Sequence, residues 1–210
     1  MSTSNRWHKR NQNLCESTLQ TAMIPVNTVL RQSLNNAVSF RRTLWEYLNV
    51  VFNSVNEERL KMFGPDRTCA EWILRNGGKV KFLDEKEYLD DYNKLPPEKT
   101  KLQLTEVDAS DSSISHYGFP HFVGCKNITK LILHNCSFIK DDAFPLMKPL
   151  DGTLKYLQVS KCRRITSKGI LQISEIQSLT DLNLFDLPIK RDNVLEELKK
   201  KLPKCNITFN

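Results

Sequence analysis

The side chains that could take part in chemistry are few, and their spacing gives little support for catalysis. His134 and Cys136 are the strongest pair, because two residues apart in a strand they would face the same way, as a base and a thiol nucleophile must. The repeat described below instead assigns Cys136 to a buried turn, so we expect a packing thiol. His116 and His121 have no carboxylate or cysteine at ligand spacing, which favours an ordinary loop over a metal site.

The motifs that identify common enzymes are missing from the sequence. It contains no glycine-rich phosphate loop, no G-x-S-x-G, no HExxH and no CxxC. We therefore expect neither catalysis nor a small-molecule substrate, and we ask instead what the structural elements could bind.

The basic residues are concentrated at the N-terminus. The formal net charge is +7, and residues 1–44 hold six basic residues against a single acid, Glu16. The rest of the chain is nearly balanced, too little for the basic stripe of a nucleic-acid-binding face. The stretch Met23 to Thr43 has no acid and combines Arg and Ser with an apolar helical stripe, so residues 1–43 are interpreted as a mitochondrial transit peptide. A solvated basic arm is the alternative.

Composition favours a folded protein in a reducing compartment. At 210 residues with 40% apolar composition, the chain can bury one core or two small ones. Its six cysteines lie far apart, and no secretory signal precedes them, which favours reduced thiols. No window approaches the roughly 18 apolar residues of a membrane span, so membrane association would run through protein contacts.

Residues 44–103 are expected to form a small helical capping domain. Apolar residues from Leu44 to Val55 recur at helical spacing, and this helix must dock its apolar face on something. Gly64-Pro65-Asp66 ends this helix and starts a second one, which ends at Gly77-Gly78.

Beyond the second helix the pattern changes. Lys79 to Leu83 alternates apolar residues with lysines, as a short strand or an extended connector does. The acidic stretch Asp84 to Tyr92 is predicted to be helical. The Trp and Tyr residues of this region are expected in the core, because large aromatic side chains at helical spacing are usually buried.

Residues 104–210 contain an apolar pattern that repeats four times. The copies of Leu-x-x-Leu-x-Leu are 24, 26 and 25 residues apart and begin at Leu104, Ile128, Leu154 and Leu179. This period is typical of leucine-rich repeats, in which a short strand turns alternate side chains inward and a small residue such as Cys136 or Cys162 fills the following turn. We predict an α/β fold: a leucine-rich-repeat solenoid of about four and a half repeats, capped by the helical domain.

The last half repeat is predicted from Leu202-x-x-Cys205-x-Ile207, after an amphipathic helix from Asn193 to Lys201. Alternation along the strands also predicts which side chains point away from the core. In the first repeat they are Glu106, Asp108 and Ser110, and in the later repeats they are Lys130, Ile132, His134, Tyr156, Gln158, Ser160, Asp181, Asn183 and Phe185. A curved face with polar, charged and aromatic groups is typical of protein binding, although plain solvated surface is the alternative.

Several short motifs match a known family in order and at compatible spacing. They are Trp45-Glu46-Tyr47-Leu48-Asn49-Val50-Val51-Phe52-Asn53, Gly64-Pro65-Asp66-Arg67, Glu71-Trp72, Asp91-Tyr92-Asn93, Leu95-Pro96, Val107-Asp108-Ala109-Ser110-Asp111-Ser112, Asp141-Asp142, Ile165-Thr166-x-x-Gly169-Ile170 and Asp186-Leu187-Pro188. Over residues 45–210 the sequence resembles the coupling factor B family, also called subunit s, of mitochondrial ATP synthase.

The resemblance implies a non-catalytic coupling factor, peripheral on the matrix side of the mitochondrial inner membrane. Its partner would be the membrane sector of the proton-translocating ATP synthase, where it would block a proton leak. A related group of leucine-rich-repeat proteins assists assembly of the membrane arm of respiratory complex I, and this alternative stays open.

The resemblance also implies a magnesium-type ion held by two main-chain carbonyls, which match Gly77 and Ser110 here. Ser110 replaces a threonine of the family, a change that a carbonyl ligand tolerates, and hard cations accept oxygen ligands. One departure concerns thiols: the family has a Cys-x-Cys pair where this chain has His134-Asn135-Cys136, so a two-thiol mechanism is not implied.

Overall fold

The computed structural model describes residues 44–210, apart from the side chains of residues 191 and 192. The chain divides into two units, Met1–Tyr47 and Leu48–Asn210, and all six strands belong to the second. The expected transit peptide, residues 1–43, lies outside the described residues, so its removal on import stays a prediction.

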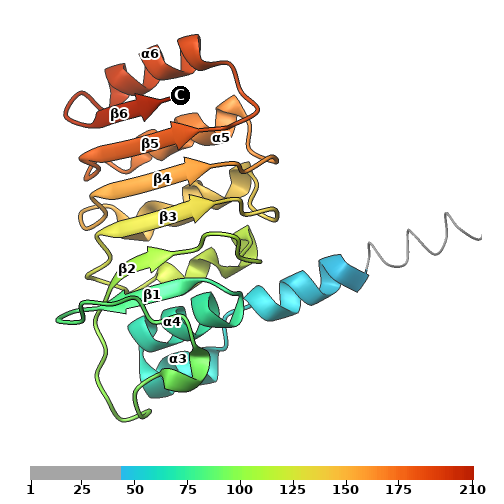
Figure 1. Cartoon of the computed structure of the whole chain (residues 1–210), viewed down its shortest axis with the longest axis vertical. Coiled ribbons are helices and arrows are strands. Elements are labelled where there is room, and N and C mark those ends of the chain that lie inside the picture. The colour runs from blue at the N-terminus through green and yellow to red at the C-terminus, as the bar shows by residue number, and fades with distance from the viewer. Residues whose placement is uncertain (1–43) are drawn as a thin grey trace, which may run out of the picture. The chain divides into compact units, whose positions relative to one another are not determined.

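Six strands form one sheet whose spatial order follows the chain order (Figure 1). They are β1 Lys79–Phe82, β2 Leu104–Asp108, β3 Lys130–His134, β4 Tyr156–Ser160, β5 Asp181–Phe185 and β6 Asn206–Phe209. The strand β1 runs antiparallel to β2, and all other neighbours are parallel. The predicted α/β class is confirmed.

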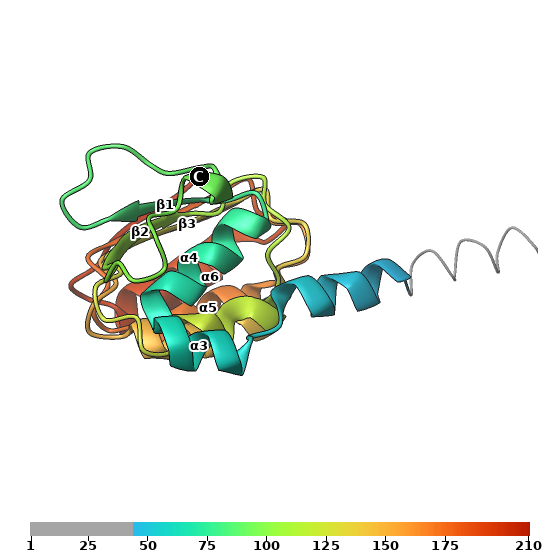
Figure 2. The same cartoon turned by 90° about the horizontal axis from the view of Figure 1, so that it is seen from below.

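Three α-helices, Pro65–Arg75, Ser167–Gln172 and Arg191–Lys201, lie on one face of this sheet (Figure 2). The α-helices are α3 Glu57–Phe63, α4 Pro65–Arg75, α5 Ser167–Gln172 and α6 Arg191–Lys201, and a further helix spans residues 44–53. Short 3-10 helices are η1 Tyr92–Lys94, η2 His116–Phe122, η3 Asp141–Ala143, η4 Pro145–Leu150 and η5 Ile173–Glu175. Within residues 44–210, no helix is long and apolar enough to cross a membrane.

The core consists of apolar rows that run across the parallel strands. One row is Val107, Leu131, Leu157, Leu182 and Ile207, and the next is Ala109, Leu133, Val159, Leu184 and Phe209. All are buried except Ile207, which is half-buried. Because side chains alternate along a strand, this register places every inward residue against its counterpart in the neighbouring repeat.

A left-handed residue follows each of the strands β2 to β5. These residues have φ between 51° and 56°, and they are Asp111, Asn135, Lys161 and Asp186. Three of the four are Asp or Asn, which tolerate this conformation better than other non-glycine residues. The turn directs the next side chain away from the outer face, and Ser112, Cys136 and Cys162 are accordingly buried.

The prediction for the last strand was wrong by two residues. The strand β6 starts at Asn206, Ile207 pairs with Leu182, and Phe209 pairs with Leu184. Phe209 is buried, whereas Cys205 lies before the strand and is half-buried. The side chain of Phe209, which is larger than that of Cys205, fills the end of the core.

Two predictions within residues 44–103 were also wrong. The first helix does not continue to Gly64: it ends at residue 53, and the side chain of Asn56 caps α3 by accepting a hydrogen bond from Arg59 N. The acidic stretch 84–92 is not helical, because Leu89 pairs with Val80 across a β-bridge with N–O distances of 2.8 and 2.9 Å.

The predicted end of the second helix and the predicted strand are confirmed. Helix α4 ends at Arg75, Gly77 has φ 85°, and β1 follows at Lys79. Of the aromatic residues expected in the core, Trp72 is buried and Tyr88 and Tyr92 are half-buried, whereas Trp45 and Tyr47 are exposed, so the expectation was wrong for these two.

The helix 44–53 packs through a polar residue and not through its apolar stripe. Val51 and Phe52 are 50% and 64% exposed, whereas Asn53 is completely buried. The Asn53 side-chain oxygen accepts hydrogen bonds from Trp72 Nε1 and Ser115 N, both at 2.9 Å. One side chain therefore joins this helix, α4 and the segment after β2.

Replacing Asn53 should be costly, because Asn53→Ala leaves two buried donors without an acceptor. We expect the free energy of unfolding in urea to fall by about 2–4 kcal/mol. Asn49→Ala, one turn earlier with a single long hydrogen bond of 3.4 Å to Ser113 O, is the control and should cost under about 0.5 kcal/mol. Equal losses for the two variants would contradict the assignment.

Candidate functional site: the polar face of the sheet

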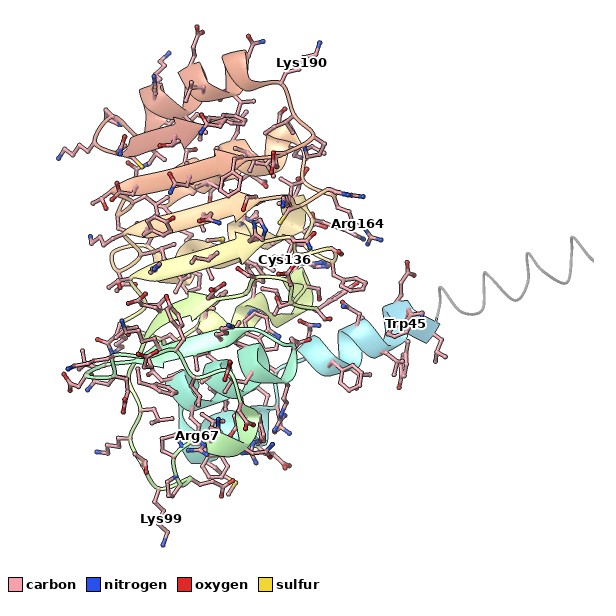
Figure 3. All side chains as sticks on the ribbon, viewed as in Figure 1. Trp45, Arg67, Lys99, Cys136, Arg164 and Lys190 are labelled. Atoms are coloured by element: carbon pink, nitrogen blue, oxygen red, sulfur yellow. The ribbon has the colours of Figure 1, made fainter. Side chains whose placement is uncertain are left out.

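The strands carry outward-pointing side chains on the face of the sheet opposite α4, α5 and α6, which we call the outer face (Figures 2 and 3). The pairing register gives three rows: Glu106, Lys130, Tyr156 and Asp181; Asp108, Ile132, Gln158 and Asn183; and His134, Ser160 and Phe185. Most of these side chains are half-buried, and Ser160 is fully buried. The structure thus brings the predicted face residues together.

Glu106 is the centre of a charged cluster at the β1 side of this face. It accepts a 2.6 Å hydrogen bond from Tyr88 Oη and lies 3.2 Å from Lys81 Nζ and 3.3 Å from Lys130 Nζ. Burial opposes ionisation, but the bonds from Tyr88 and the two lysines outweigh it and lower the pKa of Glu106. Burial and the Glu106 carboxylate raise the pKa of Tyr88, which stays a neutral donor.

Lys81 and Tyr88 belong to this face, although the sequence pattern did not predict them there. The alternation in Lys79-Val80-Lys81-Phe82 does place Lys81 on the other face of the strand from the buried Val80. Only the antiparallel pairing of Lys81 with Glu106, however, reveals the cluster. Tyr88 comes from the segment that was predicted to be a helix.

A second hydrogen-bonded chain crosses the middle of the outer face. Tyr156 Oη donates to Gln158 Oε1 at 3.1 Å and accepts from Asn183 Nδ2 at 2.9 Å. Gln158 Nε2 donates to Ser160 Oγ at 3.2 Å, and Ser160 Oγ lies 2.7 Å from His134 Nδ1. These mutual bonds fix the side chains before any partner arrives, which lowers the conformational entropy lost on binding.

His134 and Cys136 do not form a catalytic pair. His134 faces Ser160 on the outer face, whereas the left-handed Asn135 turns Cys136 inward, where its thiol donates to Ala109 O at 3.0 Å. Contact with the sulfur of Cys162, together with burial, raises the pKa of the Cys136 thiol. Cys136 therefore has the buried turn position that the sequence predicted.

Gly77 and Ser110 flank the paired ends of β1 and β2. The pairing of Lys79 with Asp108, continued outward by two residues, sets Gly77 opposite Ser110. Ser110 N donates instead to Asp108 Oδ1 at 2.9 Å, and among the described residues no hydrogen bond ends on the carbonyl oxygen of Gly77 or Ser110. Two free carbonyls fit a weakly held, largely hydrated cation.

No stronger metal site accompanies these carbonyls. Within residues 44–210, no group of three or more His, Cys, Asp or Glu side chains is placed to hold a metal ion. Magnesium at Gly77 and Ser110 stays a prediction.

His116 and His121 lie in the 3-10 helix η2 and not in a loop, which corrects the expectation. The His121 ring is 7% exposed and stacks on Trp72 with 5.1 Å between ring centroids. Neither of its nitrogens has a hydrogen-bond partner in the described part of the chain. Burial lowers the pKa of His121 to about 4. The aromatic cluster that buries it forms only in the folded chain, so spacing alone could not identify it.

This histidine predicts a stability change with pH. Its folded-state pKa of about 4 lies below the ordinary 6.5, so the unfolded chain takes up the proton first. The free energy of unfolding should fall as pH drops from 6.5 towards 4, by at most about 1.4 kcal/mol per pH unit from this group. In His121→Phe, which keeps a ring against Trp72, this part of the slope should vanish in urea titrations. An unchanged slope would contradict the assignment.

Comparison with known proteins places the chain among mitochondrial proteins. No family model matches it. It is similar to ATP synthase subunit s, mitochondrial, of Rattus norvegicus, with 35% identity over 175 residues that cover 80% of this chain and 88% of the relative. The same protein of Homo sapiens is 34% identical over 174 residues, 79% of this chain and 86% of the relative. That of Bos taurus is 33% identical over 177 residues, with 80% and 88% coverage. The chain therefore belongs to the family of mitochondrial ATP synthase subunit s.

Proposed function

We propose that this protein is a non-catalytic accessory subunit of mitochondrial ATP synthase that binds its partner through the outer face. Membership in the subunit s family carries this proposal, together with the polar and aromatic face that no helix covers. In this account the protein is peripheral on the matrix side of the inner membrane, and it docks on the membrane sector of the enzyme.

We further infer that residues 104–210 are a leucine-rich-repeat solenoid. The sequence period of 24 to 26 residues coincides with the steps between the parallel strands β2 to β5, and the apolar rows stay in register throughout. Such a stack gives a wide, rigid face, which suits the recognition of a large partner.

In our proposal the coupling role is mechanical. A rigid protein that occupies a site on the membrane sector would close a path for protons without reacting with any substrate. The buried Cys136 and its separation from His134 support a role without catalysis.

The docking face can be tested by a binding measurement on inner-membrane vesicles depleted of peripheral proteins. Tyr156→Ala removes an aromatic side chain at the centre of the face and two of its hydrogen bonds, and we expect binding to weaken by about tenfold or more. Lys199→Ala, on the exposed side of α6, is the control and should bind as wild type does.

Two outcomes of this experiment would contradict the proposal. Equal binding by Tyr156→Ala and wild type would remove the outer face as the docking site. Recovery of the bound protein with membrane-arm intermediates of complex I, and not with ATP synthase, would favour the assembly-factor alternative.

Proton conductance of the same vesicles should decrease when wild-type protein is added back.

The proposed magnesium site can be tested by calorimetry and melting of the full chain. We expect a weak signal and a raised melting temperature at millimolar magnesium, retained in Ser110→Ala because the ligand is main chain. Gly77→Ala should weaken the effect: its Cβ meets no atom within 4 Å, so only the strain of φ 85° disturbs the carbonyl. Absence of heat and of any melting shift in wild type would remove the ion from the account.

A further inference from the structure

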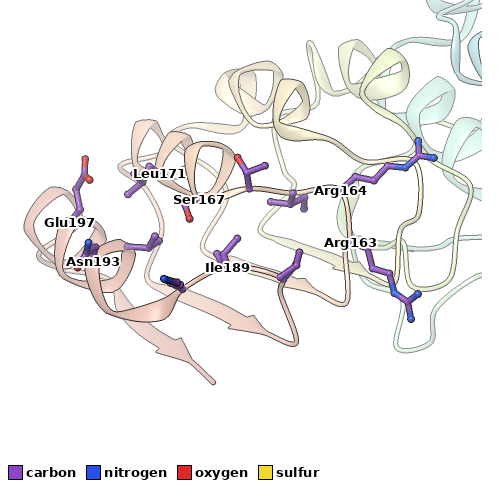
Figure 4. Close-up of a pocket in the computed structure, with 12 residues that line it drawn as sticks. Arg163, Arg164, Ser167, Leu171, Ile189, Asn193 and Glu197 are labelled. Carbon is purple, nitrogen blue, oxygen red and sulfur yellow. The ribbon is translucent and has the colours of Figure 1, made fainter.

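A groove separate from the outer face lies beside the carboxyl ends of β4 and β5. It has a volume of about 790 Å³ and is lined by the turn after β4, by α5, by the turn after β5 and by α6 (Figure 4). Its size falls within the range of ligand-binding clefts, and the carboxyl ends of parallel strands are a common place for such sites. We call it the α5–α6 groove.

The floor of the α5–α6 groove is apolar and recessed. Ile165 and Val194 are 1% and 4% exposed, and Leu171 and Ile189 are half-buried between them and the solvent. A ligand must therefore reach into the groove with a protruding apolar group.

One end of the groove is positively charged. Arg163 and Arg164 are exposed, and their side chains point away from the end marked by Asn193 and Glu197 (Figure 4). Among the described residues, neither arginine has an acidic partner within 4.0 Å, and Arg164 lies over the ring of Phe138 at 5.9 Å.

Two acidic groups near the groove, Glu197 and Asp141, are already engaged. Glu197, at the opposite end, forms an ion pair of 2.8 Å with Lys201. Asp141 accepts hydrogen bonds from Thr166 N and Thr166 Oγ1 at 2.8 and 2.5 Å. The exposed Lys190 adds a further positive charge at the margin. The groove thus offers an apolar floor and a positive end whose two arginines form no ion pair with the described acidic side chains.

We propose that the α5–α6 groove binds a segment of a partner protein in which apolar side chains are followed by acidic residues. The apolar side chains fill the floor, and the carboxylates reach the two guanidinium groups, which bind carboxylates in a bidentate fork. This site is additional to the outer face, and it stands whether or not the partner is ATP synthase.

The exposure pattern favours a protein segment over an anionic membrane surface. A protein that lies on a membrane inserts exposed apolar side chains next to its basic residues. The exposed large apolar residues of the described chain include none that line this groove, whose apolar atoms are recessed.

The test uses the full chain as bait for a random dodecapeptide library displayed on phage. We expect enriched peptides that join apolar residues to Asp or Glu. Their affinity should fall by about tenfold in Arg163→Glu/Arg164→Glu, which loses two exposed charge contacts and gains repulsion. The control Lys199→Glu/Lys200→Glu changes the net charge by the same amount as the arginine variant. Its residues lie on α6 but do not line the groove, so it should bind the peptides as wild type does. Ile189→Ser tests the apolar half and should also weaken binding.

Two results would overturn the proposal. One is a selection without acidic and apolar enrichment, or with peptides that bind the arginine variant as well as wild type. The other concerns binding of the protein to vesicles of phosphatidylcholine with phosphatidylglycerol. If the arginine variant binds these vesicles more weakly than the lysine variant does, the groove would be assigned to a lipid headgroup. Circular dichroism of each variant, whose changed side chains are exposed or half-buried, checks that the fold is kept.

Discussion

The left-handed residue that follows each of the strands β2 to β5 is the constraint on which the rest of the structure depends. Asp111, Asn135, Lys161 and Asp186 each reverse the direction in which the next side chain points. Before the turn, side chains alternate between the outer face and the core, and after it Ser112, Cys136 and Cys162 are buried. Because the turns recur at the period of the strands, the rows on both faces stay in register from β2 to β5.

The stack needs a cover at its first strand, and buried polar groups attach that cover. The antiparallel β1 completes the edge of β2, while α4 packs behind it. Glu71 of α4 is 3% exposed and accepts a bidentate pair of bonds from Arg59, at 2.7 and 2.9 Å, and a third from Arg67 at 3.1 Å. Arg67 also donates to Pro96 O, so one buried carboxylate joins α3, α4 and the proline segment. Removing Glu71 would leave buried positive charge without a partner, which is expensive.

The repeat made much of the sheet predictable, since its period and alternation identify both the buried and the outward residues of β2 to β5. The failures occur where local pattern competes with tertiary contacts. The apolar stripe from Leu44 to Val55 indicated a docked helix, yet the buried contact is made by Asn53, because its oxygen satisfies the donors of Trp72 and Ser115. The stretch 84–92 has a helical composition, but pairing of Leu89 with Val80 holds it extended. The α5–α6 groove joins two turns 25 residues apart, and no local motif marks it.

We propose different tasks for the two sides of the sheet: partner recognition by the outer face, and support of the core by the helical layer, which also carries the groove. The most direct measurement is photo-crosslinking of the full chain bound to inner-membrane vesicles, with the reactive residue placed at position 132 of β3 or at position 199 of α6. The account predicts adducts with ATP synthase subunits from position 132 and few from position 199. Adducts from position 199 alone would contradict it.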